Sequence, residues 1–180
     1  MGSINLPNAL SLGRILLVPA MVALLLERWE EHGLAVFLIA ALTDLLDGWV
    51  ARRRNQVTTL GKLLDPLADK LLVCSAFIAL AQTHPRDVKA WMVVIIVSRE
   101  FAVTGLRNIA STKGVTLSAS HLGKAKTVGQ MAAIVLLLLG RERLGAVGGL
   151  VPIVLWAAVV MAFVSMLQYF VRFARQAGFD

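Results

Sequence analysis

Cysteine and charged residues are both scarce in this sequence, and each scarcity excludes a class of protein. Cys74 is the only cysteine among 180 residues, so an internal disulfide and a thiolate cage for a metal are excluded. Charged residues make up 16% of the chain, whereas 58% of the residues are hydrophobic. Soluble domains usually contain about 45–50% apolar residues, so the composition argues against an ordinary water-soluble domain.

The apolar residues are gathered into long runs. The mean hydropathy is +0.75, and each run is long enough to cross a lipid bilayer as a helix. The loops between the runs are too short to fold alone. The sequence therefore predicts an all-α integral membrane protein, one domain over 1–180, with six transmembrane helices at roughly 9–26, 34–51, 61–82, 89–110, 124–140 and 146–171.

The surplus of basic residues indicates how the chain is oriented in the membrane. The net charge is +7, and if six helices alternate, most cations fall on the side that holds both termini. Cytoplasmic loops of membrane proteins carry such an excess of Lys and Arg, so we expect both termini in the cytoplasm. Because these cations flank membrane segments, we do not expect nucleic-acid binding. The cations on the expected cytoplasmic side are Arg14, Arg52, Arg53, Arg54, Lys62, Arg99, Arg107, Lys113, Lys124, Lys126, Arg172 and Arg175.

Four aspartates stand out against these apolar runs. Asp44 and Asp47 are three residues apart, and Asp65 and Asp69 are four apart, so each pair shares one face of a helix. A short connection joins the two segments, which predicts that the helices are antiparallel neighbours. The two acidic faces are therefore expected to meet at the cytoplasmic end of the membrane.

Four carboxylates at one place point to bound cations. Without cations they would repel one another and take up protons, whereas hard oxygen ligands suit Mg²⁺ or Mn²⁺, and four carboxylates can share two ions. Two such ions stabilise phosphoryl oxygens during displacement reactions. Arg52 adds a fixed cation for a phosphate, and Gly48 and Gly61 leave room for close approach. The pattern indicates a site for a phosphate ester at the membrane surface.

Two other interpretations of the aspartates remain open. The acids could pair with nearby Lys and Arg residues as solvated helix ends. They could also belong to an ion pathway, as in a divalent-cation transporter. A transporter would need polar groups in the outer half of the membrane as well, where stretches such as LLVPAMVALLL are entirely apolar.

A second group of charges lies in the fourth and fifth apolar segments. Arg99 and Arg107 are expected on one face of a helix, and Glu100 could pair with a cation there. The segment that begins at Gly123 adds Lys124 and Lys126. Arg and Lys side chains converging from two helices would bind an anionic group, such as a phosphate on a second substrate. The alternative is the ordinary belt of cations on the cytoplasmic side.

The aspartate region resembles a known family. Read in order, the residues Asp44-xx-Asp47-Gly48-xx-Ala51-Arg52-x8-Gly61-xxx-Asp65-xxx-Asp69 are similar to the full signature of the CDP-alcohol phosphatidyltransferases. The resemblance implies that family's six-helix fold, its common homodimer and its dependence on a divalent metal. It also implies transfer of a phosphatidyl group from a CDP-linked donor to an alcohol, with CMP leaving.

The resemblance also implies roles for single residues. Asp44, Asp47 and Asp65 would bind one metal ion, and Asp44, Asp65 and Asp69 a second. Asp69 would also act as the general base that accepts the proton of the attacking hydroxyl. The residues implied in contact with the CDP-linked donor are Asn5, Asn8, Gly48, Arg52 and Thr58.

The acceptor alcohol is not specified by the aspartates, because members of the family use several. The segments that bear on it are similar to bacterial members that take CDP-diacylglycerol as donor and sn-glycerol 3-phosphate as acceptor. That resemblance implies a bacterial inner membrane protein with its active site facing the cytoplasm. Phosphatidylglycerol or inositol phosphate remains an alternative acceptor. The segments are NLPNALSLGRILLVP at 5–19, SREFAVTGLR at 98–107, GKAKTVGQM at 123–131 and SMLQY at 165–169.

Overall fold

The computed structural model describes residues 6–54, 59–112 and 120–176, all as helices and the short turns between them. Within these ranges the side chains at 6–8, 44–54, 59–60, 62–63 and 121 are not described. No strand occurs in these ranges, so the all-α prediction is confirmed for them. The chain divides into two compact units, 1–85 and 86–180, and the single-domain prediction stays a prediction.

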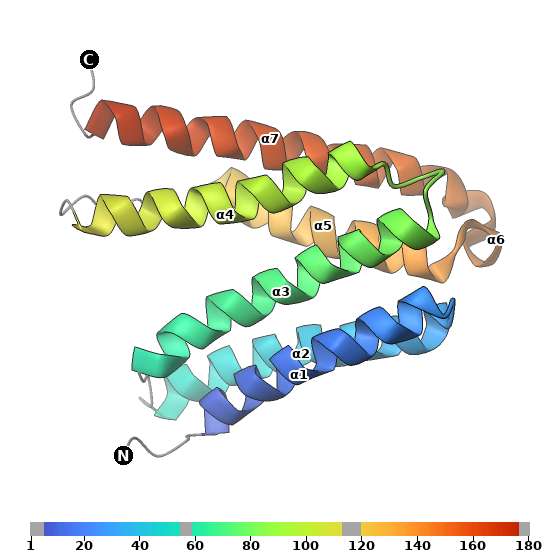
Figure 1. Cartoon of the computed structure of the whole chain (residues 1–180), viewed down its shortest axis with the longest axis horizontal. Coiled ribbons are helices and arrows are strands. Elements are labelled where there is room, and N and C mark those ends of the chain that lie inside the picture. Colours follow the sequence, from blue (N-terminus) through green and yellow to red (C-terminus); the bar gives the residue numbers. More distant parts are fainter. Residues whose placement is uncertain (1–5, 55–58, 113–119, 177–180) are drawn as a thin grey trace. The chain divides into compact units, whose positions relative to one another are not determined.

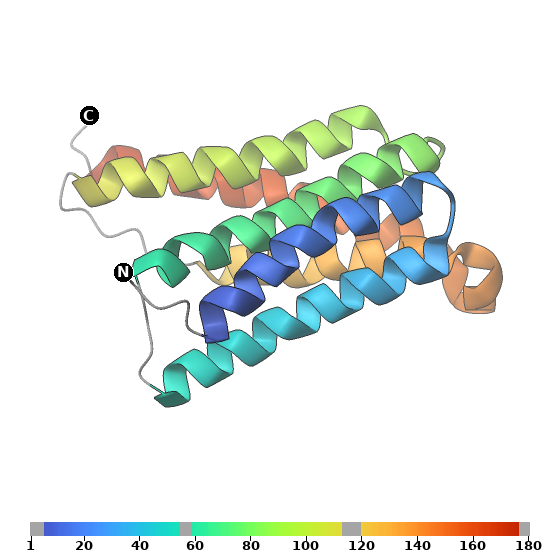
Figure 2. The same cartoon turned by 60° about the horizontal axis from the view of Figure 1, so that its bottom comes forward.

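The first unit contains three long helices: α1 (Leu6–Leu26), α2 (Glu30–Arg54) and α3 (Thr59–Thr83). Helix α1 packs against both of the others, whereas α2 and α3 touch each other to a much smaller extent. Because α2 runs back along the unit, α1 and α3 point in the same direction (Figures 1 and 2). The first helix, rather than a direct α2–α3 pair, is therefore the centre of this unit.

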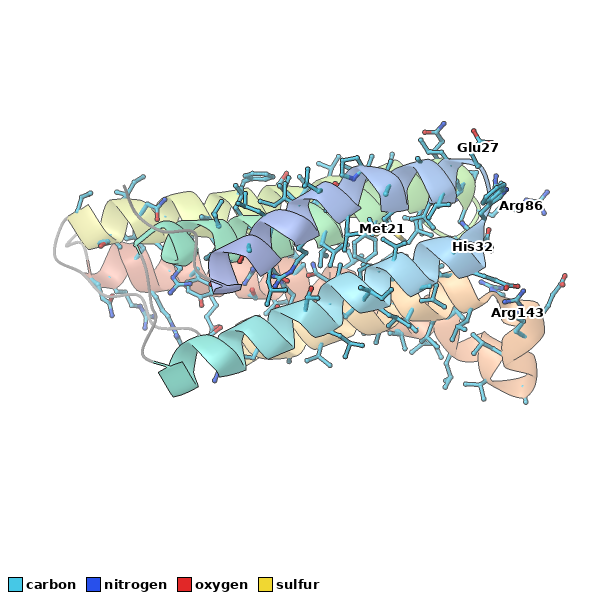
Figure 3. All side chains as sticks on the ribbon, turned by 90° about the horizontal axis from the view of Figure 1, so that it is seen from below. Met21, Glu27, His32, Arg86 and Arg143 are labelled. Carbon is cyan, nitrogen blue, oxygen red and sulfur yellow. The ribbon has the colours of Figure 1, made fainter. Side chains whose placement is uncertain are left out.

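Apolar side chains of all three helices fill the first unit. Met21 is completely buried and lies between α1 and α2 (Figure 3). Phe37 of α2 and Phe77 of α3 are also buried, and side chains of this size contribute most to core stability. Glu27 and His32 lie at the turn between α1 and α2, far from the start of α1.

The second unit contains α4 (Ala90–Thr112), α5 (His121–Leu139), the short helix α6 (Arg141–Leu144), the 3-10 turn η1 (Gly145–Gly149) and α7 (Leu150–Gln176). Here the last helix is central, because α7 packs against both α4 and α5. Gly129 of α5 faces α7, since a Cβ atom there would lie 2.7 Å from the end of the flexible Met161 side chain and 3.9 Å from Ala158 Cα. Helix α5 ends at Gly140, whose positive φ of 74° suits a residue without a side chain.

Burial follows the pattern of a protein in lipid rather than in water. Arg14 is 1% exposed, whereas Leu16, two residues later on the same helix, is 76% exposed. Arg99, Glu100 and Lys126 are also buried, although such residues are seldom buried in soluble proteins. Apolar side chains on the outside, with the few charged ones buried inside, are what a bilayer solvent favours.

The six predicted spans coincide with the six long helices, with ends that differ by a few residues. By length and composition, three stretches are apolar enough to cross a membrane: Ala9–Leu26, Leu122–Leu139 and Arg141–Gln176. The chain is thus a helical protein with apolar helices that could span a membrane. The number of spans and the side on which the termini lie stay predictions.

Candidate functional site

The described part of the aspartate cluster lies on α3. Asp65 and Asp69 are one helical turn apart and half-buried, and Gly61 lies buried one turn before them. Because α3 is helical from Thr59 to Thr83, the predicted shared face of Asp65 and Asp69 is confirmed. Both aspartates are thus partly exposed, while the adjacent Ala68 is completely buried.

Helix α1 supplies two polar side chains that the sequence interpretation did not assign. Ser11 is 0% exposed, and its hydroxyl donates a hydrogen bond of 2.5 Å to Asp65 Oδ1. Arg14 follows three residues later on the same helix, with its side chain buried. A serine and an arginine one turn apart inside a long apolar run are the signal that could have identified this polar face.

The remaining predicted residues of this site fall where side chains are not described. Asp44, Asp47, Gly48 and Arg52 all lie within α2, so their helical spacing is confirmed and their contacts stay predictions. Asn8 lies within α1. Asn5 and Thr58 lie outside the residues that the structure describes.

The donor atoms present fit a hard divalent cation. Asp65 and Asp69 offer carboxylate oxygens on one helix face, and carboxylates are the ligands that Mg²⁺ and Mn²⁺ prefer. Among the side chains that are described, no group of three His, Cys, Asp or Glu residues is placed to hold a metal ion. The sequence predicts that Asp44 and Asp47 complete the ligand set, and this stays a prediction.

A buried ionic network occupies the interior of the second unit. Arg99 Nη1 donates to both carboxylate oxygens of Glu100 at 3.2 Å, and Lys126 Nζ donates to Glu100 Oε1. All three side chains are less than a tenth exposed. The network joins α4 to α5, and among the side chains that the structure describes, its contacts set two cations against the one carboxylate of Glu100. Counted over these residues, it carries excess positive charge away from water.

Helix α7 holds the arginine of this network in place. Ser165, which is completely buried, accepts hydrogen bonds from Arg99 Nε at 3.1 Å and Nη2 at 2.9 Å. The ring of Tyr169 lies 5.9 Å from Arg99 Cζ, within the range of a cation–π contact. Contacts with a serine and an aromatic ring fix the plane of the guanidinium group.

The start of α5 is tied to the same place. Ser120 caps α5 by accepting a hydrogen bond of 3.0 Å from the Gly123 backbone N–H. The Ser120 backbone N–H donates to the Tyr169 hydroxyl at 3.1 Å. A Cβ atom on Gly123 would lie 3.6 Å from both Arg99 Nη2 and the Tyr169 oxygen. This is an ordinary contact distance, and it shows that α5 begins beside the arginine, one turn before Lys126.

The structure divides the four cations that the sequence grouped together. Arg99 and Lys126 are buried in the network, whereas Arg107 and Lys124 are exposed. Lys124 and Lys126 are two residues apart, which places them on different faces of α5. Arg107 follows Arg99 by eight residues, or about 12 Å along the helix and about 80° around it. The expected common face of the two arginines is thus not observed.

Gln130 is a further polar residue that the sequence interpretation left without a role. It lies one turn after Lys126 on α5 and is 1% exposed. Its Nε2 atom is buried and has no hydrogen-bond partner among the residues described. A buried donor without a partner costs about 1–3 kcal/mol, so Gln130 marks a second buried polar position on α5, four residues after Lys126.

Comparison with known proteins gives a consistent result over nearly the whole chain. The family model for CDP-alcohol phosphatidyltransferase matches residues 4–164. A Bacillus subtilis (strain 168) protein named CDP-diacylglycerol–glycerol-3-phosphate 3-phosphatidyltransferase is 42% identical over 92% of this chain and 93% of its own length. A Rickettsia typhi protein of the same name is 35% identical over 92% of this chain and 95% of its own. A Mycobacterium tuberculosis protein named probable phosphatidylglycerophosphate synthase is 36% identical over 97% of this chain and 84% of its own length.

Proposed function

The chain belongs to the CDP-alcohol phosphatidyltransferase family, and on that premise we propose that it acts in phospholipid biosynthesis. It transfers the phosphatidyl group of CDP-diacylglycerol to sn-glycerol 3-phosphate, giving phosphatidylglycerophosphate and CMP. Relatives named for this reaction match over 92% of the chain, which supports the assignment. Membership of a transferase family leaves the cation-transporter interpretation without support.

The observation that carries the acceptor assignment is the buried network of Arg99, Glu100 and Lys126. Its excess positive charge suits an anionic group, and Arg99 presents a planar set of N–H donors of the kind that binds phosphate. Serine carries no phosphate and would not need such a site. We assign the acceptor phosphate to Arg99 and Lys126, with the exposed Arg107 and Lys124 as outer cations that attract it.

The aspartates provide the chemistry of the transfer. Asp44, Asp47, Asp65 and Asp69 bind two Mg²⁺ or Mn²⁺ ions, which supply charge stabilisation for the phosphate oxygens of the donor. Asp69 accepts the proton of the acceptor's C1 hydroxyl. That oxygen then forms a bond to the β-phosphorus, and the bond from this phosphorus to the CMP oxygen breaks. The donor is held by Asn5, Asn8, Gly48, Arg52 and Thr58.

The membrane placement follows from the same premise. The six long helices span a bacterial inner membrane, with both termini and the aspartates on the cytoplasmic side. The acyl chains of the donor then stay in the bilayer while its headgroup reaches the carboxylates. The protein acts as a homodimer, as its family commonly does.

An assay of CMP release tests the proposed reaction. Purified protein receives CDP-diacylglycerol with one of four acceptors: glycerol 3-phosphate, inositol phosphate, phosphatidylglycerol or serine. We expect release with glycerol 3-phosphate in the presence of Mg²⁺, complete loss with EDTA, and recovery when Mg²⁺ or Mn²⁺ is added in excess. Release only with another acceptor would contradict the acceptor assignment, and no release with any acceptor would contradict the reaction itself.

Replacing Arg99 with lysine tests the acceptor site separately. Arg99→Lys keeps the positive charge but removes the planar donor set that contacts Ser165 and Glu100. We expect KM for glycerol 3-phosphate to rise about tenfold, the effect of losing roughly 1.4 kcal/mol of binding, with KM for the donor unchanged.

The matched control for this substitution lies on the same helix. Arg107→Lys makes the identical change at an exposed position, where the geometry of one long side chain matters little. We expect its KM for glycerol 3-phosphate to stay within about twofold of the original, consistent with weak exposed charge contacts. Equal KM values in the two variants would contradict the division into buried and outer cations.

A further inference from the structure

Ser11 is placed to influence the aspartate site without belonging to the family signature. It lies on α1, whereas the carboxylate that it contacts, Asp65, lies on α3 and 54 residues away in the chain. The serine is completely buried, and a buried hydroxyl is retained at low cost only when it has a partner. The contact with Asp65 provides that partner.

The direction of the hydrogen bond determines what the serine does. An ionised carboxylate can only accept hydrogen bonds, so the Ser11 hydroxyl is the donor and Asp65 Oδ1 the acceptor. The bond restricts rotation of the carboxylate group. Since each carboxylate oxygen has two lone pairs, Oδ2 and one lone pair of Oδ1 remain available to a cation.

Arg14 shows that this contact belongs to a polar face of α1. Helices α1 and α3 run in the same direction side by side (Figures 1 and 2). Arg14 lies three residues after Ser11 on α1, so the two share one side of the helix, and both are buried. A hydroxyl and a permanent positive charge therefore lie one turn apart in the buried part of α1.

We propose that Ser11 is a positioning residue of the metal site, which fixes the orientation of the Asp65 carboxylate before a divalent ion binds. This inference rests on the proposed function, because it requires that Asp65 binds the ion. Partners that orient metal ligands typically change metal affinity by about 10–100-fold when they are removed. Ser11→Ala should therefore weaken divalent-ion binding without removing any ligand.

The test measures Mn²⁺ binding to the purified protein in detergent, without substrates, from the electron paramagnetic resonance signal of free Mn²⁺. We expect Ser11→Ala to bind Mn²⁺ about tenfold more weakly, and Ser11→Thr, which restores the hydroxyl, to bind close to the original affinity. In turnover assays, the Mg²⁺ concentration for half-maximal activity should rise in Ser11→Ala, and saturating Mg²⁺ should restore most of kcat. If Ser11→Ala does not fold, Ser11→Cys provides the same comparison with a weak donor of similar size.

Two further variants separate failure of this inference from failure of the proposed site. Ser165→Ala removes the other completely buried serine that contacts a site residue, Arg99, and should leave Mn²⁺ affinity unchanged while raising KM for glycerol 3-phosphate. Asp65→Asn should weaken Mn²⁺ binding strongly. If Asp65→Asn does so but Ser11→Ala binds normally, the positioning role is wrong. If Asp65→Asn also binds normally, the proposed metal site is wrong.

Discussion

Asp69→Asn is expected to reduce the rate of CMP release by about three orders of magnitude, within the range that a general base contributes. The amide cannot accept the proton of the acceptor hydroxyl, and it also removes one negative charge from the aspartate cluster. Asp69 is half-buried on the same face of α3 as Asp65, so the substitution changes the chemistry with little change in volume. Binding of CDP-diacylglycerol should largely survive, because the other three aspartates and the donor contacts remain.

Turnover and donor binding are measured separately to check this expectation. The rate of CMP release is measured at saturating substrates, and donor affinity is measured by equilibrium binding of CDP-diacylglycerol. Asp87→Asn, the same change in the turn before α4, serves as the control and should leave turnover unchanged. Unchanged turnover in Asp69→Asn would overturn the assignment of the base. Recovery of turnover with excess Mg²⁺ would show that Asp69 acts as a metal ligand and not as the base.

Glu100→Gln is expected to cause a large loss of stability in the second unit. Among the described side chains, Glu100 is the carboxylate that pairs with both Arg99 and Lys126. Its removal leaves two buried cations without their common partner, which typically costs about 3–5 kcal/mol. For a chain of this size, such a loss lowers the unfolding temperature by about 6 °C or more.

Thermal unfolding in mild detergent measures this effect. Glu142→Gln makes the identical change on α6, where the side chain is exposed, and should shift the unfolding temperature by no more than about 2 °C. An equal unfolding temperature in the two variants would show that the network adds nothing to stability. Because Glu100 also holds Lys126, the variant should in addition bind glycerol 3-phosphate more weakly at temperatures where it remains folded.

The helices and the aspartate spacing could be predicted because they depend on local sequence. Long apolar runs specify helices in lipid, and residues four apart share a helix face whatever surrounds them. Asp65 and Asp69 were therefore placed correctly on one face of α3. The ends of the helices were less certain, because charged residues such as those at 52–54 extend a helix beyond its apolar part.

Contacts between distant segments could not be predicted in the same way. Arg14 was counted with the cations that flank the membrane, yet it is buried, because the central position of α1 depends on how three helices pack. The bond from Ser11 to Asp65 has the same origin. The separation of Lys124 from Lys126, in contrast, followed from helical geometry alone and was available from their spacing.

The central position of α7 has a consequence for the order in which the protein assembles during synthesis. The ribosome delivers α1 first, so the first unit can form as soon as α3 emerges. The second unit cannot form before α7 has been made, because α4 and α5 both pack against this last helix. Until Ser165 arrives, Arg99 lacks its contacts with α7, and charged groups are poorly tolerated in lipid. We therefore expect these charges to stay out of the lipid, within the insertion machinery or at the membrane surface, until translation is nearly complete.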